Sequence, residues 1–271
     1  MYKHRGFALP FIIMIIIGTL VPLCSIVFYG FTDDTGNFTI ENFLAMFSEE
    51  HIKALIFSVL LALISTFICL ILAYPLGLIL RKSKLGKSGF VIFIFVLPMW
   101  MNFLLRTMAW QVILERNGLL DHFCQFLNIP FVEIINTPFA VVLGMVYDFL
   151  PFMILPIYNV LKSMDEGLIE ASYDLGAGKF TTLRKVILPL SVPGIISGIT
   201  MVFVPSLTTF VISNMLGGGK INLIGNIIEQ EFTVSANWNL GSGLSFVMMI
   251  LIVVSMVIFT KLDEDGEVNL L

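Results

Sequence analysis

Two ionisable side chains stand alone inside long apolar stretches of this sequence, Arg106 and Asp148. A charge at the centre of a membrane span costs roughly 2.5 to 3.5 kcal/mol on insertion scales, so a retained one faces a cavity or a partner. The two side chains could neutralise each other as an ion pair. Alternatively, the Asp148 carboxylate could face a wet path and attract an ammonium group. The sequence leaves both interpretations open.

Groups for several other chemistries are missing. A phosphate-binding loop needs an early glycine before Gly-Lys-Ser or Gly-Lys-Thr, but Arg81 takes that place ahead of Gly86-Lys87-Ser88. His4, His51 and His122 lie outside the apolar stretches and far apart, which does not suit a metal-dependent hydrolase. We therefore predict a chain that is not an enzyme, binds no ATP by this route and needs no cofactor or metal.

The composition places the chain in lipid. Of its 271 residues, 58% are hydrophobic and 13% charged, and the mean hydropathy is +0.97. A water-soluble domain does not reach these values, and a disordered chain could not leave 25 Phe in water. The net charge of −4 shows no surplus of Lys and Arg for phosphate contacts, so we expect membrane lipid and no nucleic acid as a partner.

Six apolar stretches are long enough to cross a bilayer core as helices, which takes about 20 residues each. They are Phe7–Tyr29, Ala54–Leu80, Phe90–Ile113, Phe139–Leu161, Leu188–Asn214 and Gly243–Thr260. Arg106 lies in the third stretch and Asp148 in the fourth. The sequence thus predicts an all-α membrane protein with six transmembrane helices.

The distribution of Lys and Arg predicts the orientation, because positive residues gather on the cytoplasmic side. The N-terminus, the 81–89 loop, the 162–187 loop and the C-terminal tail hold eleven of them, whereas the opposite loops hold only Lys53, Arg116 and Lys220. Both termini are therefore expected in the cytoplasm. We divide the chain into an N-terminal part (1–53), a membrane domain (54–260) and a C-terminal tail (261–271).

The longest cytoplasmic loop, residues 162–189, carries a short helical pattern. Its apolar residues at helical spacing are Met164, Leu168, Ala171 and Leu175. Gly176 and Gly178 follow and can end a helix with a sharp reversal. Periodicity alone fits a solvated helix as well as a docking surface.

The order of residues in this loop resembles a known motif. Glu170-Ala171-Ser172 precedes Gly176 by three residues, and Val186-x-Leu188-Pro189 follows nine residues later. This arrangement resembles the EAA loop of permease subunits of binding-protein-dependent ABC importers. Ser172 replaces the usual second Ala, and Val186 replaces the usual Ile.

The resemblance implies a role for the loop. In that family it forms a coupling helix that docks in a cleft of a separate ATPase and passes its movement to the spans. Residues carried over to this ATPase interface are Glu170, Ala171 and Gly176, with Leu175 and Ala177 as neighbours.

Further motifs resemble the spermidine/putrescine branch of these permeases. They are Leu97-Pro98-Met99-Trp100-Met101-Asn102, Gly144-Met145-Val146-Tyr147, Leu150-Pro151-Phe152-Met153, Met215-Leu216-Gly217-Gly218-Gly219-Lys220 and Leu223-Ile224-Gly225-Asn226. The resemblance implies the type I ABC importer (MetI-like) permease fold in the cell membrane. It also implies a polyamine substrate, a second homologous permease, a cytoplasmic ATPase dimer and an extracytoplasmic substrate-binding protein.

A polyamine substrate would be bound by aromatic and polar side chains in the spans, because ring faces attract cations and hydrogen-bond acceptors bind ammonium groups. The candidate substrate-path residues are Asp148, Tyr147, Trp100, Asn102 and Trp110. For Trp110 and Tyr147, an interfacial belt or helix packing is the commoner role.

Two alternatives stay open. The chain could serve an ABC importer for another solute, such as an opine, an anion or a sugar. It could also be a self-contained channel or secondary carrier, which predicts that the 165–180 loop binds no ATPase.

Overall fold

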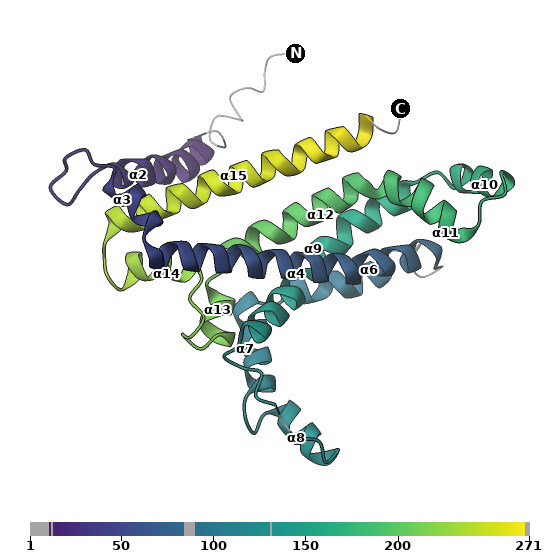
Figure 1. The fold of residues 1–271 in the computed structure, drawn as a ribbon, viewed down its shortest axis with the longest axis horizontal. Coiled ribbons are helices and arrows are strands. Elements are labelled where there is room, and N and C mark those ends of the chain that lie inside the picture. Colours follow the sequence, from purple (N-terminus) through teal and green to yellow (C-terminus); the bar gives the residue numbers. More distant parts are fainter. Residues whose placement is uncertain (1–10, 12, 84–89, 131, 269–271) are drawn as a thin grey trace. The chain divides into compact units, whose positions relative to one another are not determined.

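The computed structural model describes residues 11, 13–83, 90–130 and 132–268, and this part of the chain is mainly helical (Figure 1). Its α-helices are α2 (Val21–Gly30), α3 (Glu41–Leu44), α4 (Glu49–Lys82), α6 (Phe90–Val96), α7 (Phe103–Leu114), α8 (Leu119–Phe126), α9 (Pro138–Ser163), α10 (Glu166–Asp174), α11 (Lys179–Thr182), α12 (Leu188–Thr208), α13 (Val211–Leu216), α14 (Ile224–Thr233) and α15 (Trp238–Val268). Short π- or 3₁₀-helical segments are η1 (Ile16–Leu20), η2 (Ala45–Phe47), η3 (Leu97–Trp100) and η4 (Leu183–Ile187).

Five helical segments of the described chain are long and apolar enough to cross a membrane. They are Ile13–Gly30, Glu49–Lys82, Pro138–Ser163, Lys179–Thr208 and Trp238–Lys261. A sixth crossing requires that the bent pair Phe93–Trp100 and Phe103–Phe126 forms one span. The start of the first predicted span, residues 7–10, lies outside the described residues.

The span predicted over Phe90–Ile113 is broken rather than straight. Its two arms meet at 96° around Met101 and Asn102. Pro98 lies in the short η3 turn, and the Asn102 side-chain oxygen accepts hydrogen bonds from the amides of Leu104 (2.8 Å) and Leu105 (3.4 Å). A proline that cannot donate, followed by an N-cap, ends one helix and starts another in a new direction.

The span predicted over Leu188–Asn214 ends earlier, at Thr208, and α13 begins after a two-residue break. The Asn226 side chain stabilises this break by donating hydrogen bonds to the Phe210 carbonyl (3.1 Å) and to Asn214 Oδ1 (2.7 Å). A Cβ at Gly225 would lie 2.8 Å from the Thr208 carbonyl, so the two segments approach closely.

By its contacts the chain divides into two compact units, 1–55 with 227–253, and 56–226 with 254–271. In the larger unit α9 is the central helix: 61% of its most apolar window is buried, against 33% for α4. The close approach of α12 to α9 depends on small residues. A Cβ at Gly194 would lie 2.9 Å from the Pro156 carbonyl, and one at Gly198 would lie 2.6 Å from Met153 Sδ.

Gly194→Ala is expected to destabilise the protein by about 1 to 3 kcal/mol, because the new methyl group meets a backbone carbonyl that cannot turn away. Thermal unfolding in detergent measures the effect. The matched control is Gly18→Ala, where nothing lies within 4 Å of the added Cβ. Equal melting temperatures for the two variants would contradict the close α9–α12 contact.

The smaller unit has a core of its own. The rings of Phe31, Phe43 and Phe246 cluster with centroid distances of 4.4 to 5.9 Å. The Asn42 side chain donates to the Gly30 carbonyl (3.1 Å) and thereby ties the end of α2 to α3. A Cβ at Gly243 would lie 2.6 Å from Asn42 Cβ, so α15 begins against the same turn.

Candidate functional site

The 162–189 loop folds as the helix and reversal that its sequence predicts. The Asp165 carboxylate caps α10 by accepting from the Gly167 amide at 2.9 Å. Gly176 then adopts φ +79, a left-handed conformation that ends the helix. Gly178 has extended backbone and is the N-cap of α11. Met164 precedes α10 and is not part of its apolar stripe.

The inner face of α10 packs on its own loop. Ser172 is buried, and its hydroxyl lies 2.9 Å from the Thr182 hydroxyl of α11. Because the side chain is small and its hydroxyl has a partner, this departure from the motif's usual Ala fits the turn. The Ala177 amide donates to the Ser172 carbonyl at 3.0 Å and closes the reversal.

The outer face of the loop is apolar and exposed. Leu175 is 89% exposed and Phe180 75%, while Leu168 and Ala171 are also exposed. Glu170 stands exposed on the same helix. Exposed apolar side chains beside an acidic one, on a folded helix, suit a docking surface.

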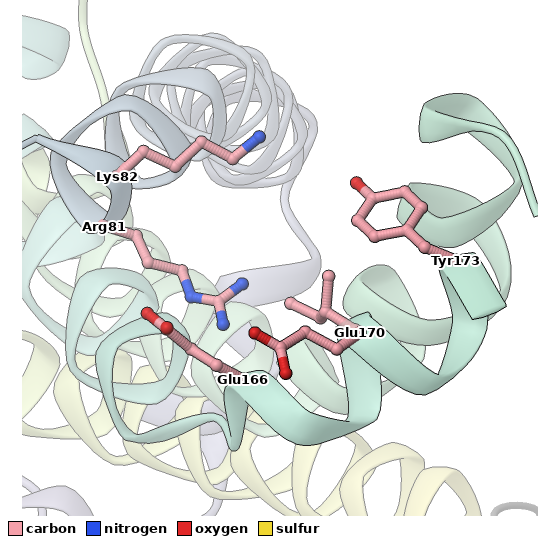
Figure 2. A pocket seen from close by; sticks show the side chains of 6 residues that line it. Arg81, Lys82, Glu166, Glu170 and Tyr173 are labelled. Carbon is pink, nitrogen blue, oxygen red and sulfur yellow. The ribbon is translucent and has the colours of Figure 1, made fainter.

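A cavity of about 360 Å³ separates α10 from the end of α4. Figure 2 shows Arg81 and Lys82 at the last turn of α4, facing Glu166, Glu170 and Tyr173 on α10. The Arg81 guanidinium points toward the two carboxylates. The basic C-terminal end of α4 therefore faces the acidic side of α10, and the two helices carry opposite charges across the cavity.

Arg106 and Asp148 form a buried ion pair in the larger unit. Arg106 Nη1 lies 3.3 Å from Asp148 Oδ1, and the two side chains are 7% and 0% exposed. The Thr107 hydroxyl donates to Asp148 Oδ2 at 3.2 Å. The structure thus shows the ion pair that the sequence allowed, and a path role of Asp148 stays a prediction. Among the described residues, Arg106 Nε and Nη1 and Asp148 Oδ1 have no hydrogen-bond partner, so the pair is held by charge.

The other predicted path residues form two groups. Trp110 of α7 and Tyr147 of α9 meet edge to face with centroids 5.3 Å apart, next to the ion pair in sequence. Trp100 is 77% exposed and contacts the Phe93 ring, with centroids 5.7 Å apart. Asn102 caps α7, a structural role that was not predicted for it.

Asn102→Ala is expected to cost about 1 kcal/mol, because the first amides of α7 lose their acceptor. Asn102→Asp keeps an acceptor at the same place and should retain the stability of the parent chain. Thermal unfolding of both variants in detergent tests this difference. Equal losses would show that the cap does not stabilise the bend.

Two contributing residues were not among the sequence candidates. Thr107 reaches Asp148 only because α7 packs on α9, and threonine in an apolar run is too common to signal this. Arg81 faces α10 across a separation of more than 80 residues. The sequence shows that Arg81 ends an apolar run, but it does not show that Arg81 lies opposite α10.

These features agree with what comparison shows. Residues 5–265 match the family described as the binding-protein-dependent transport system inner membrane component. The chain belongs to this family. It is therefore a multi-pass inner-membrane transport protein and not an enzyme, and it works with a binding protein and an ATPase.

Sequence relatives include two spermidine/putrescine transport system permease proteins PotB. The one from Haemophilus influenzae is 36% identical over 241 residues, covering 86% of this chain and 84% of the relative. The one from Escherichia coli K12 is 34% identical over 227 residues, covering 83% and 82%. A third relative, the E. coli inner membrane ABC transporter permease protein YdcU, is 30% identical and covers 87% and 80%.

The fold is also that of solved ABC importers. A bacterial ABC transporter involved in import of the acidic polysaccharide alginate superposes with a TM-score of 0.81 at 16% identity, covering 96% of this chain and 94% of that one. The complex of such a transporter with an alginate-bound periplasmic protein gives 0.78 at 15% identity, covering 94% and 91%. The predicted type I importer (MetI-like) permease fold is confirmed.

Proposed function

We propose that this permease serves an ATP-driven importer of polyamines, spermidine or putrescine. The observation that carries the proposal is the identity of 36% and 34% to two spermidine/putrescine permeases over more than four fifths of both chains. The predicted outer loops hold ten acidic residues against three basic ones, and this charge agrees with a cationic solute. The aromatic side chains of α7 and α9 agree with it as well.

In this proposal α10 is the coupling helix. Glu170, Ala171, Leu175, Gly176 and Ala177 form the surface that a cytoplasmic ATPase dimer contacts. The exposed apolar face of the loop supports this role, since a folded helix gains stability by covering such a face. A push on α10 would reach α9 through the short link at Met164 and Asp165, and α4 through the facing charges of Arg81 and Glu170.

The rest of the assembly follows from the same proposal. A second homologous permease completes the translocation path, and an extracytoplasmic binding protein delivers the solute. Both termini lie in the cytoplasm, which the excess of Lys and Arg in alternate loops supports. Residues 54–260 form the translocation domain, with the shorter parts 1–53 and 261–271 at its two ends.

The proposed path runs along α7 and α9, which carry Trp110, Tyr147 and Asp148, and past the bend before α7, where Trp100 and Asn102 lie. Arg106 neutralises Asp148 in this structure, so a passing ammonium group would compete with the guanidinium for the carboxylate. Such a site binds its solute weakly, and weak binding suits release.

Uptake of labelled spermidine and putrescine into vesicles that contain both permeases, the ATPase and the binding protein tests the function. We expect ATP-dependent uptake that an excess of unlabelled polyamine inhibits and that a sugar or an anion does not. Uptake of another solute class in its place would overturn the polyamine assignment. Transport by this chain without any ATPase would overturn the importer role as well.

A further inference from the structure

The smaller unit contains an open cavity of about 460 Å³ that has no part in the proposed path. The end of α2, the turn after it and the start of α15 line this cavity. The side chains that matter here are Phe28, Tyr29, Asp33, Asp34 and Trp238. A volume of this size is in the range of small-molecule sites.

Aromatic rings form its walls. The Trp238 ring lies 6.4 Å from the Tyr29 ring, centroid to centroid, and the Phe28 ring lies 5.6 Å from that of Tyr29 at 77°. Trp238 is 56% exposed and Tyr29 40%, so part of each ring stays open to a ligand. Ring faces carry negative potential, and several of them around one space attract alkylammonium groups.

Two carboxylates of the turn line the same cavity. Asp33 is held in place: its Oδ1 accepts from the Thr35 hydroxyl at 2.7 Å and from the Asn37 amide at 2.8 Å. The hydrogen bond from the Thr35 hydroxyl has the largest effect on the pKa of Asp33, and that from the Asn37 amide has the next largest. Both lower this pKa below its ordinary value, so the Asp33 carboxylate is charged at neutral pH. Asp34 is exposed and makes no hydrogen bond or ion pair with any residue that the structure describes.

No basic side chain among the described residues lines the cavity. In the described part of this unit Lys53 is the one Lys or Arg, and it pairs with Glu49 on its own helix. The carboxylates therefore keep a charge that nothing within the described unit neutralises. Aromatic walls and unneutralised carboxylates together are the chemistry that recognises an organic ammonium ion.

We propose that this cavity binds the ammonium end of an aliphatic amine, between the rings of Tyr29 and Trp238 and the carboxylates of Asp33 and Asp34. The site is a staging site for the cationic solute on the outer side of the membrane. This role rests on the proposed function, whereas the binding chemistry does not. A belt of aromatic residues that only anchors the chain at the membrane surface would bind lipid without regard to the carboxylates.

Binding of 1,4-diaminobutane tests the site. The permease pair with its ATPase, in nanodiscs of phosphatidylcholine alone and without nucleotide, is titrated while saturation-transfer NMR follows the methylene protons of the diamine. Uncharged 1,4-butanediol is the control probe and should give no saturable signal. Asp34→Asn and Trp238→Ala are each expected to weaken diamine binding by about five-fold.

Glu41→Gln is the matched control variant, since it removes one exposed acidic charge from the same segment outside the cavity. We expect it to change binding by less than about two-fold, because a screened distant charge contributes little. Equal weakening by Glu41→Gln and Asp34→Asn would overturn the site in favour of a diffuse acidic surface. Unchanged binding in both Asp34→Asn and Trp238→Ala would overturn it in favour of aromatic packing alone.

If Trp238→Ala fails to fold, Asp34→Asn carries the test, because the Asp34 side chain makes no hydrogen bond or ion pair with the described residues that the substitution would remove. The outcome is separable from that of the proposed function. Diamine binding that depends on Asp34, without polyamine uptake, contradicts only the transported solute. ATP-driven polyamine uptake, without binding that depends on Asp34, contradicts only this site.

Discussion

Gly176→Val is expected to abolish solute uptake and to leave the permease inserted in the membrane. Gly176 has φ +79 at the end of α10, and a β-branched residue in that conformation is strained whatever the free space. Relief of the strain moves Leu175 and Ala177 and distorts the surface proposed for the ATPase. The expected result is loss of ATP-dependent uptake together with loss of ATPase in co-purification.

Gly178→Val is the matched control. It lies two residues away, it also has nothing within 4 Å of an added Cβ, and its φ of −76 is open to any residue. Gly178→Val should keep most of the uptake. The difference between the two variants then reports the effect of backbone conformation, because both add a side chain of the same size. Equal uptake by the two variants would remove the Gly176 turn from the coupling mechanism.

Glu170→Lys tests the same surface by charge. It leaves the backbone alone but places a cation opposite Arg81 and Lys82 and reverses the sign that an ATPase would meet. We expect uptake to be lost with normal membrane insertion, measured by uptake in vesicles and by the amount of permease in the membrane fraction. Full uptake would count against Glu170 as a coupling residue.

The sequence predicted those features that depend on neighbours along the chain. Long apolar runs located the spans because a helix in lipid must satisfy its own backbone groups. Spacing and two glycines placed α10 and its end, since a glycine takes the left-handed conformation with little strain and Gly176 adopts it. Spans, helix starts and helix ends depend on residues close together in the chain, so patterns along the sequence predict them.

The bend near Met101 was not predicted, because hydropathy measures how apolar a stretch is and says nothing of its direction. The signals were present in Pro98 and in Asn102, whose side chain caps α7. The early end of α12 had no local signal of this kind. It is fastened by Asn226, which lies beyond α13 in the chain and reaches back to Phe210.

In the candidate site, too, features set by nearby residues were predictable and contacts between distant residues were not. The helix of the coupling loop was predictable, but its facing partner Arg81 lies on another span and entered only with the fold. For Asp148, a depth in its span similar to that of Arg106, within about 5 Å at the helical rise per residue, allowed an ion pair and could not decide between pairing and an open path. Packing of α7 on α9 brings Arg106 and Thr107 to the two carboxylate oxygens, whereas the role of Asp148 in a path stays a prediction.

Asp148→Leu is expected to destabilise the permease by about 3 to 5 kcal/mol, because it leaves the buried Arg106 guanidinium without a counter-charge. Thr107→Val, which removes only one hydrogen bond to the carboxylate, should cost about 1 kcal/mol. Thermal unfolding in detergent gives both values. Similar losses in the two variants would show that the ion pair contributes no more than one hydrogen bond from a hydroxyl to the carboxylate.

The double variant Arg106→Met/Asp148→Leu separates stability from transport. Apolar residues of similar volume often replace a buried ion pair without loss, so the double variant should regain most of the stability that Asp148→Leu loses. Uptake should nevertheless stay below that of the parent chain, because no carboxylate remains to meet the ammonium group of the solute. Full recovery of polyamine uptake together with stability would make the pair structural and would move the path away from Asp148. Recovery of stability alone would place the carboxylate on the path, with Arg106 as the charge that the solute displaces.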